Sequence, residues 1–183
     1  MNILYIFDFD DTLVDSDAEV KIQHADGTTT LLSSEKYAKY REQKGDVFDF
    51  SDFDSYPRNA EIIEPVFAEL RSAIASSGPS NVVILTARSN PDPVKFFLNE
   101  NNVGNIDIVA VGTSDPNAKA MYILERVKSD GFDEVIVFED NVKNIRRIRK
   151  VLTKSGTKLQ TNRVSNGRIV DVLRERKFRR SKK

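Results

Sequence analysis

The 183-residue sequence contains no cysteine and only one histidine, and its positive and negative charges are equal in number. Without cysteine, neither a disulfide nor a thiolate metal site can form. The absence favours the reducing cytoplasm, although a secreted protein can also lack cysteine. The single histidine, His24, lies in a predicted hairpin, where we expect it at the surface without a catalytic role.

Long apolar runs are also missing from the sequence. No run approaches the roughly 20 residues that a membrane-spanning helix needs, so we expect no membrane association. The apolar opening, residues 1–7, is short and has no basic segment before it, so we do not expect a signal peptide. Hydrophobic residues make up 39% and charged residues 31%, which is typical of a globular protein with one core.

The zero net charge hides an uneven distribution. Residues 146–183 contain 15 Lys and Arg against two acids, so this region carries +13 and residues 1–145 carry −13. A basic C-terminal region on an acidic body suggests an anionic partner, with nucleic acid as the first candidate. The alternative is a solvated helix followed by a frayed end at residues 174–183.

Short apolar runs alternate with segments of helical periodicity along much of the chain. The apolar runs predict buried strands at residues 2–7, 82–85, 106–111 and 134–138. The periodic segments predict helices at residues 61–76, 93–101, 118–129 and 142–152. This alternation predicts an α/β fold, a Rossmann-like parallel sheet with helices on both faces and ligands at the carboxyl ends of the strands.

Residues 15–58 do not follow this alternation. They contain a predicted β-hairpin, residues 19–32, and a predicted helix, residues 34–43. We therefore expect a small cap insert at 15–58, directly after the first strand.

The rest of the chain is expected to form two further parts, a core and a tail. The core comprises residues 1–14 and 59–172, and the basic C-terminal tail comprises residues 173–183. Within the core, residues 158–172 predict a second hairpin, or a strand followed by a short helix.

The insert is rich in aromatic residues, which allow two interpretations. Their rings can form a small core of the insert, the interpretation we favour, or stack on a base or sugar of a substrate. The six residues are Tyr37, Tyr40, Phe48, Phe50, Phe53 and Tyr56.

Two aspartates, Asp8 and Asp10, directly follow the first predicted strand. Carboxylates at i and i+2 on a loop can point into the same space, where like charge separates their pKa values. One then stays ionised as a nucleophile while the other holds a proton for the leaving group. So much negative charge also predicts a divalent cation, and oxygen ligands favour Mg²⁺. The alternative is a turn that uses aspartate for capping.

Polar residues also follow the second and fourth predicted strands. Thr86, Ala87 and Arg88 can bind a phosphoryl group through a hydroxyl, backbone N–H groups and a guanidinium, unless Thr86 only caps a helix. After the fourth strand, Glu139 and Asp140 are candidate metal ligands, and the alternative is again helix capping.

Two residues on predicted helices complete the set of candidates. Asn144 can add a carbonyl ligand to the metal or support another ligand. Lys119 can neutralise phosphate charge or orient Asp8, unless it is an ordinary surface lysine.

Along the chain these motifs follow the order Asp-x-Asp, threonine, lysine and acidic pair. With this order the chain resembles the haloacid dehalogenase (HAD) superfamily of phosphohydrolases over residues 2–152. The resemblance implies that Asp8 attacks phosphorus and that Asp10 protonates the leaving oxygen and then activates water. It implies that Thr86 and Lys119 hold the phosphoryl group. It also implies that Mg²⁺ is bound by the Asp8 carboxylate, the Asp10 carbonyl and Asp140.

The sequence departs from the family pattern at two places. Position 11 is aspartate where glycine is commonest, and Glu139 and Asn144 stand where a second acidic ligand is usual, which leaves open which of them supports the metal. The Leu85–Arg88 segment, the short insert and the basic tail are similar to those of small phage and bacterial HAD phosphatases, including the phosphatase modules of polynucleotide kinase-phosphatases.

The sequence therefore predicts a cytoplasmic, magnesium-dependent phosphomonoester hydrolase that forms an aspartyl-phosphate. Its phosphorylated substrate is a nucleotide or a polynucleotide end, or alternatively a small metabolite. An alternative from another class is a catalytically idle module that binds RNA or a protein. The sequence does not indicate an oligomeric state.

Overall fold

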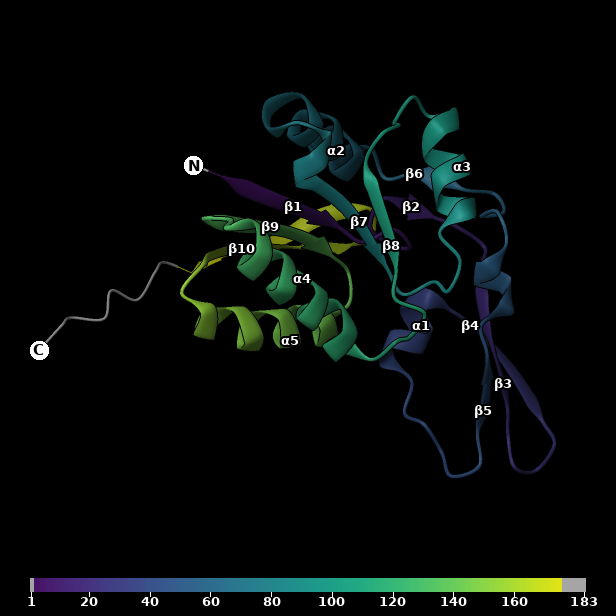
Figure 1. Cartoon of the computed structure of the whole chain (residues 1–183). Helices are drawn as coiled ribbons and strands as arrows, with labels where there is room; N and C mark the ends of the chain where they lie inside the picture. Colours follow the sequence, from purple (N-terminus) through teal and green to yellow (C-terminus); the bar gives the residue numbers. More distant parts are fainter. Residues whose placement is uncertain (1, 176–183) are drawn as a thin grey trace, which may run out of the picture.

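The computed structural model describes residues 2–175, which form a six-stranded sheet with helices around it (Figure 1). The strands lie in the order β11-β10-β9-β1-β7-β8, and all neighbours are parallel except the hairpin partners β10 and β11. Their bounds are β1 (Ile3–Phe7), β7 (Val82–Thr86), β8 (Asp107–Ala110), β9 (Glu134–Glu139), β10 (Lys158–Ser165) and β11 (Arg168–Glu175). The mostly parallel sheet confirms the predicted α/β class and is compatible with a Rossmann-like fold.

Helices cover both faces of the sheet, as predicted. One apolar cluster joins the sheet to α2 (Glu64–Ser77) and α3 (Asp92–Glu100), and a second joins it to α4 (Pro116–Asp130) and α5 (Val142–Leu152). In β1, Leu4 and Ile6 belong to the second cluster and Phe7 to the first. A strand buried on both faces in this way explains the continuous apolar run in the sequence.

The helix predicted from residue 61 begins later, at Glu64. Pro65 lacks a backbone N–H and is tolerated only in the first turn of a helix, so the helix cannot begin four residues before it. The two residues Glu61–Ile62 instead form the short strand β6, which pairs with β2 (Val14–Asp15). Ile62 therefore lies on a strand, although the predicted helix range included it.

Residues 15–58 contain a three-stranded sheet of their own, in the order β4-β3-β5. Its strands are β3 (Glu19–Gln23), β4 (Thr29–Ser33) and β5 (Val47–Asp49), accompanied by α1 (Ser34–Lys39) and the 3₁₀ helix η1 (Ser51–Asp54). The predicted hairpin is confirmed, and the predicted helix ends at Lys39 instead of residue 43. Strand β5 was not predicted, although the alternation of acids and aromatics there is a strand signal.

A small apolar cluster fills this part of the chain. Its buried members are Ala18, Val20, Ile22 and Phe53, and Tyr37, Tyr40 and Phe48 pack against it. These four aromatic residues therefore do form a small core, as favoured above, whereas Phe50 and Tyr56 are exposed.

His24 lies in the predicted hairpin but is only partly exposed, so the expected surface position holds in part. Its side chain is 18% exposed, and both ring nitrogens have hydrogen-bond partners, Asp46 and Thr30. Thr30 lies on β4 and Asp46 on the loop before β5, and the contact with Asp46 is too distant in sequence for the local pattern to show.

The C-terminal hairpin of β10 and β11 is confirmed, and the alternative of a strand followed by a helix is wrong. Strand β11 extends to Glu175. Residues 173–175 therefore belong to this strand, and the predictions that the tail begins at 173 and that fraying begins at 174 are wrong for them. Arg174, for example, pairs with Gln160 and donates to its side-chain oxygen at 2.7 Å. The rest of the predicted tail, residues 176–183, lies outside the described residues. No helix within residues 2–175 is long and apolar enough to cross a membrane.

Candidate functional site

The ends of β1, β7 and β9 meet at one edge of the sheet, where a cavity of about 610 Å³ lies between the sheet and the insert. Asp8 follows β1, and its N–H donates to the carbonyl of Phe138 in the neighbouring strand. Glu139 is the last residue of β9. Because parallel strands end at the same edge, side chains distant in sequence converge there.

Lys119 contacts two carboxylates at the bottom of this cavity. Its ammonium donates to Asp8 Oδ1 at 2.6 Å and to Glu139 Oε2 at 2.9 Å, and the residue is 3% exposed. Burial disfavours its charge, but the two carboxylates outweigh this and place the pKa of Lys119 above its ordinary value. The alternative of an ordinary surface lysine is therefore wrong.

The position of Lys119 follows from the start of α4. Asp115 caps this helix by accepting from the N–H of Asn117, and Pro116 occupies the first turn. The helix therefore begins at the cavity, and its first turn directs Lys119 to the sheet edge. Lys119 and Asp8, 111 positions apart in the sequence, form a buried ion pair.

Asp10 is held by a bidentate ion pair with Arg88. The guanidinium donates to the two oxygens of Asp10 at 2.7 and 2.9 Å, and from its third nitrogen to the carbonyls of Phe53 and Ser55 at 2.7 and 2.9 Å. Arg88, predicted to bind substrate, therefore connects Asp10 to the insert in this structure. Burial raises the pKa of Asp10, and the guanidinium offsets part of this effect.

Thr86 and Ala87 lie differently with respect to the cavity. Ala87 lines it, whereas Thr86 is fully buried and its hydroxyl accepts from the N–H of Arg88 at 3.2 Å. This bond supports the turn after β7. The predicted contact of Thr86 with a phosphoryl group remains a prediction.

Three carboxylates, those of Asp8, Glu139 and Asp140, form a cluster that can hold a metal ion. One oxygen from each lies within 4.8 Å of the others. Burial, together with the charges of Glu139 and Asp8, raises the pKa of Asp140 well above its ordinary value. Such a concentration of negative charge is stabilised by a cation, and the oxygen donors fit a hard divalent ion.

Glu139 is the most fully bonded member of this cluster. Besides Lys119, its carboxylate accepts from the N–H of Asn141 and from the side-chain amide of Asn144, each at 3.1 Å. Asn144 is buried and donates to Glu139, so it supports a candidate ligand through its amide nitrogen. Asn141 itself caps α5, so the helix-capping alternative for this segment holds at that position.

Asp11 is an acid that the sequence left without a role. Its φ angle is 57°, a left-handed conformation that glycine adopts freely, which is consistent with the glycine usual at this position in the resembled family. Burial and the charge of Asp10 raise the pKa of Asp11 to about 7. One of its oxygens, and the hydroxyl of Thr12, are buried without a hydrogen-bond partner among the described residues. The run of three acids in four positions was the available signal.

The insert supplies an aromatic wall to the cavity, formed by Tyr37, Phe48 and Phe50. The rings of Phe48 and Phe50 stack at 6.3 Å between centroids, and Tyr37 meets Phe50 edge-on at 5.3 Å. The acids Asp49 and Asp54 line the cavity beside this wall, and Asp54 accepts from the hydroxyl of Ser89. Tyr37 and Phe48 thus belong both to the insert core and to the cavity wall.

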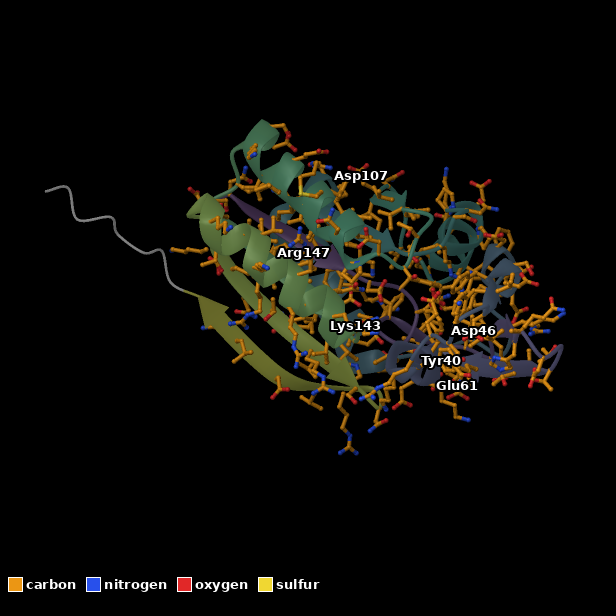
Figure 2. All side chains as sticks on the ribbon, turned by 90° about the horizontal axis from the view of Figure 1, so that it is seen from below. Tyr40, Asp46, Glu61, Asp107, Lys143 and Arg147 are labelled. Atoms are coloured by element: carbon orange, nitrogen blue, oxygen red, sulfur yellow. The ribbon has the colours of Figure 1, made fainter. Side chains whose placement is uncertain are left out.

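The basic residues of the C-terminal region gather partly on α5, which contains Lys143, Arg146, Arg147, Arg149 and Lys150. Figure 2 shows Lys143 and Arg147 on this helix. Arg147 donates twice to the side-chain oxygen of Asn117 in α4, at 2.6 and 3.0 Å. Part of the basic charge thus contributes to helix packing, and the expected nucleic-acid partner remains a prediction.

The fold and site define a class of protein, an α/β protein with a mostly parallel sheet and a buried acidic cluster, able to hold a metal ion, at the carboxyl edge. No protein-family model, curated protein or solved structure matches the chain. Any finer assignment therefore depends on the residues and geometry of the site.

Proposed function

We propose that the protein is a magnesium-dependent phosphomonoester hydrolase of the HAD type, with Asp8 as nucleophile. The observation that carries the proposal is the arrangement around Asp8. One oxygen is held by Lys119 at 2.6 Å, Asp10 lies two residues away, and Glu139 and Asp140 complete an acidic cluster at the cavity. These groups are the nucleophile, acid and cation ligands that phosphoryl transfer needs.

Asp8 must be ionised to attack phosphorus. Burial and the charge of Glu139 raise its pKa to about 6, while Lys119 opposes that rise. At pH 7 the carboxylate is therefore mostly charged. Lys119 holds Oδ1, which leaves Oδ2 as the attacking atom.

In the first step, Oδ2 of Asp8 forms a bond to phosphorus and the ester oxygen leaves with a proton from Asp10. In the second step, Asp10 takes a proton from water, the water oxygen attacks phosphorus, and the Asp8–phosphorus bond breaks to release phosphate. Asp10 needs a proton for the first step, which the bidentate bonds from Arg88 disfavour. We therefore expect one of these bonds to loosen when substrate binds.

The ligands of Mg²⁺ would be Asp8, Asp140 and the carbonyl of Asp10, with Glu139 as a further carboxylate of the cluster. The ion would neutralise charge on the transferring phosphoryl oxygens. The raised pKa values of Asp8 and Asp140 fit this role, since burial and neighbouring carboxylates both disfavour a negative charge that a cation would stabilise.

The proposal is tested by hydrolysis of p-nitrophenyl phosphate with Mg²⁺ and with EDTA. We expect activity that needs the metal and is lost in Asp8→Asn and in Asp10→Asn. Acid-quenched wild-type protein should carry one phosphoryl group on the Asp8 peptide by mass spectrometry. Asp107→Asn is a matched control, because Asp107 is exposed and does not line the cavity.

Two other results would point elsewhere. Activity that survives in Asp8→Asn would exclude Asp8 as the nucleophile. Wild-type protein that hydrolyses no phosphomonoester with any divalent ion would favour the idle binding module.

A further inference from the structure

The side of the cavity that receives the leaving group is formed by the insert. In phosphoryl transfer the attacking and leaving oxygens lie roughly in line. Asp8 attacks from the sheet edge, so the leaving group points away from the sheet, into the part of the cavity lined by α1, β5 and η1. Residues of the insert therefore contact whatever alcohol carries the phosphate.

This wall presents aromatic surface in a fixed arrangement. Phe50 is 38% exposed, yet its ring contacts both Tyr37 and Phe48, which pack on the insert core. An exposed ring held by other rings offers a pre-organised surface for a flat group. Such a ring can accept any base, because every base presents a flat π face for stacking.

The charges of the cavity exclude a second phosphate. Within residues 2–175, two basic residues line it, Arg88 and Lys119, and both are engaged with carboxylates of the site. Beside the aromatic wall lie Asp49 and Asp54, whose negative charge repels a further anion. Polynucleotide ends and bisphosphates carry such an anion next to the reacting group.

We propose that the substrate is a nucleoside monophosphate whose base stacks on Phe50, with no second phosphate. This inference rests on the proposed function and names its substrate class. The cavity, about 610 Å³, lies within the range of roughly 300–1,000 Å³ typical of small-molecule sites. The phosphate lies at Asp8 and Lys119, the sugar spans the cavity beside Asp10, and the base reaches the aromatic wall.

The test compares kcat/KM for a nucleoside 5′-monophosphate, ribose 5-phosphate, which lacks the base, and a nucleoside 3′,5′-bisphosphate. We expect the monophosphate to exceed ribose 5-phosphate by about tenfold or more, because only the monophosphate has a base to stack. We expect it to exceed the bisphosphate by about tenfold or more as well, because Asp49 and Asp54 repel the second phosphate. In Phe50→Ala the ratio of monophosphate to ribose phosphate should fall about tenfold, mainly through KM. The control Phe96→Ala, which removes an exposed ring outside the cavity, should keep the wild-type ratio.

Equal kcat/KM for monophosphate and ribose phosphate would overturn the inference, as would a preference for the bisphosphate or for an oligonucleotide with a terminal phosphate. Metal-dependent hydrolysis of p-nitrophenyl phosphate that is lost in Asp8→Asn would leave the proposed function intact in that case.

A binding measurement separates the two proposals if no turnover is found. Calorimetry on Asp8→Asn with Mg²⁺ compares the affinities of the nucleoside monophosphate and of ribose phosphate. Tighter binding of the nucleotide, reduced by Phe50→Ala, supports the base site even without hydrolysis, whereas equal affinities overturn it.

Discussion

Two groups of polar side chains, one buried and one partly buried, differ in how completely they are bonded. The first is the acidic site at the sheet edge, and the second is a hydrogen-bonded network in the insert. In this insert network, His24 bonds Thr30 and Asp46 at 2.8 Å each, and Tyr40 donates to Asp46 at 2.7 Å. The N–H of Gln43 donates to the same carboxylate at 2.8 Å, so Asp46 has partners on both oxygens.

The pKa of aspartate is shifted in opposite directions in the two groups. The bond from Tyr40 holds the pKa of Asp46 below its usual range, whereas burial raises the pKa of Asp8 to about 6 and that of Asp11 to about 7. The insert network is satisfied and serves the fold. The site keeps surplus negative charge, which a fold alone does not require and which a cation would balance.

The largest difference is expected in catalysis. Asp8→Asn removes the nucleophile and should lower kcat on p-nitrophenyl phosphate by a factor on the order of 10⁴ or more. Asp46→Asn changes a buried aspartate of the insert network and should lower kcat by about twofold at most. Similar losses of kcat in Asp8→Asn and Asp46→Asn would show that the insert network matters for catalysis as much as the acidic site does.

Stability should show the next largest effect, at Lys119. Lys119→Met leaves Asp8 and Glu139 buried without their cation, which should lower the free energy of unfolding by about 3–5 kcal/mol. Urea denaturation at pH 7 measures it. The matched control is Lys39→Met, which breaks the exposed helical pair with Glu35 and should cost about 0.3–0.5 kcal/mol. If Lys119→Met lowered the free energy of unfolding no more than Lys39→Met, the buried ion pair would stabilise the fold no more than the exposed one.

The pH dependence of stability isolates Asp8. Because its pKa is raised from 3.8 to about 6 in the metal-free fold, the ionised form is disfavoured there, and the wild type loses stability relative to Asp8→Asn as pH rises from about 4 to 7. The change should reach about 3 kcal/mol, at about 1.4 kcal/mol per pKa unit.

Urea denaturation of both proteins in EDTA across this range gives that difference. Mg²⁺ should reduce it at pH 7, because the ion binds the charged carboxylate. A difference that stays constant with pH would show that the pKa of Asp8 is not raised.

The smallest effect is expected in the insert network. Tyr40→Phe removes a donor to Asp46, so the pKa of that carboxyl should rise toward 3.8, as NMR titration can measure. Since a lowered pKa stabilises the fold only above the unfolded value, the variant should lose stability at pH 7 and little below pH 3. Turnover should stay near the wild-type value; a large loss would connect the network to the site.

The local sequence pattern was enough to locate most of the candidate site. Apolar runs ending in acids placed Asp8, Asp10, Glu139 and Asp140 at strand ends, because buried parallel strands and their carboxyl edges have a simple signature. The pattern failed where contacts are distant in sequence. Arg88 bonds Asp10 across 78 positions and reaches the insert as well, and no local signal records such a partner.

The sequence alone determined which residues could be charged at the sheet edge, since strand runs, helix periods and a proline in a first helical turn are local properties. Only the tertiary structure decided which of those charges are balanced. Whether a buried carboxylate is satisfied depends on groups that folding brings within about 3 Å. Lys119 reaches Asp8 at 2.6 Å, whereas one buried oxygen of Asp11 has no hydrogen-bond partner in the described part of the chain.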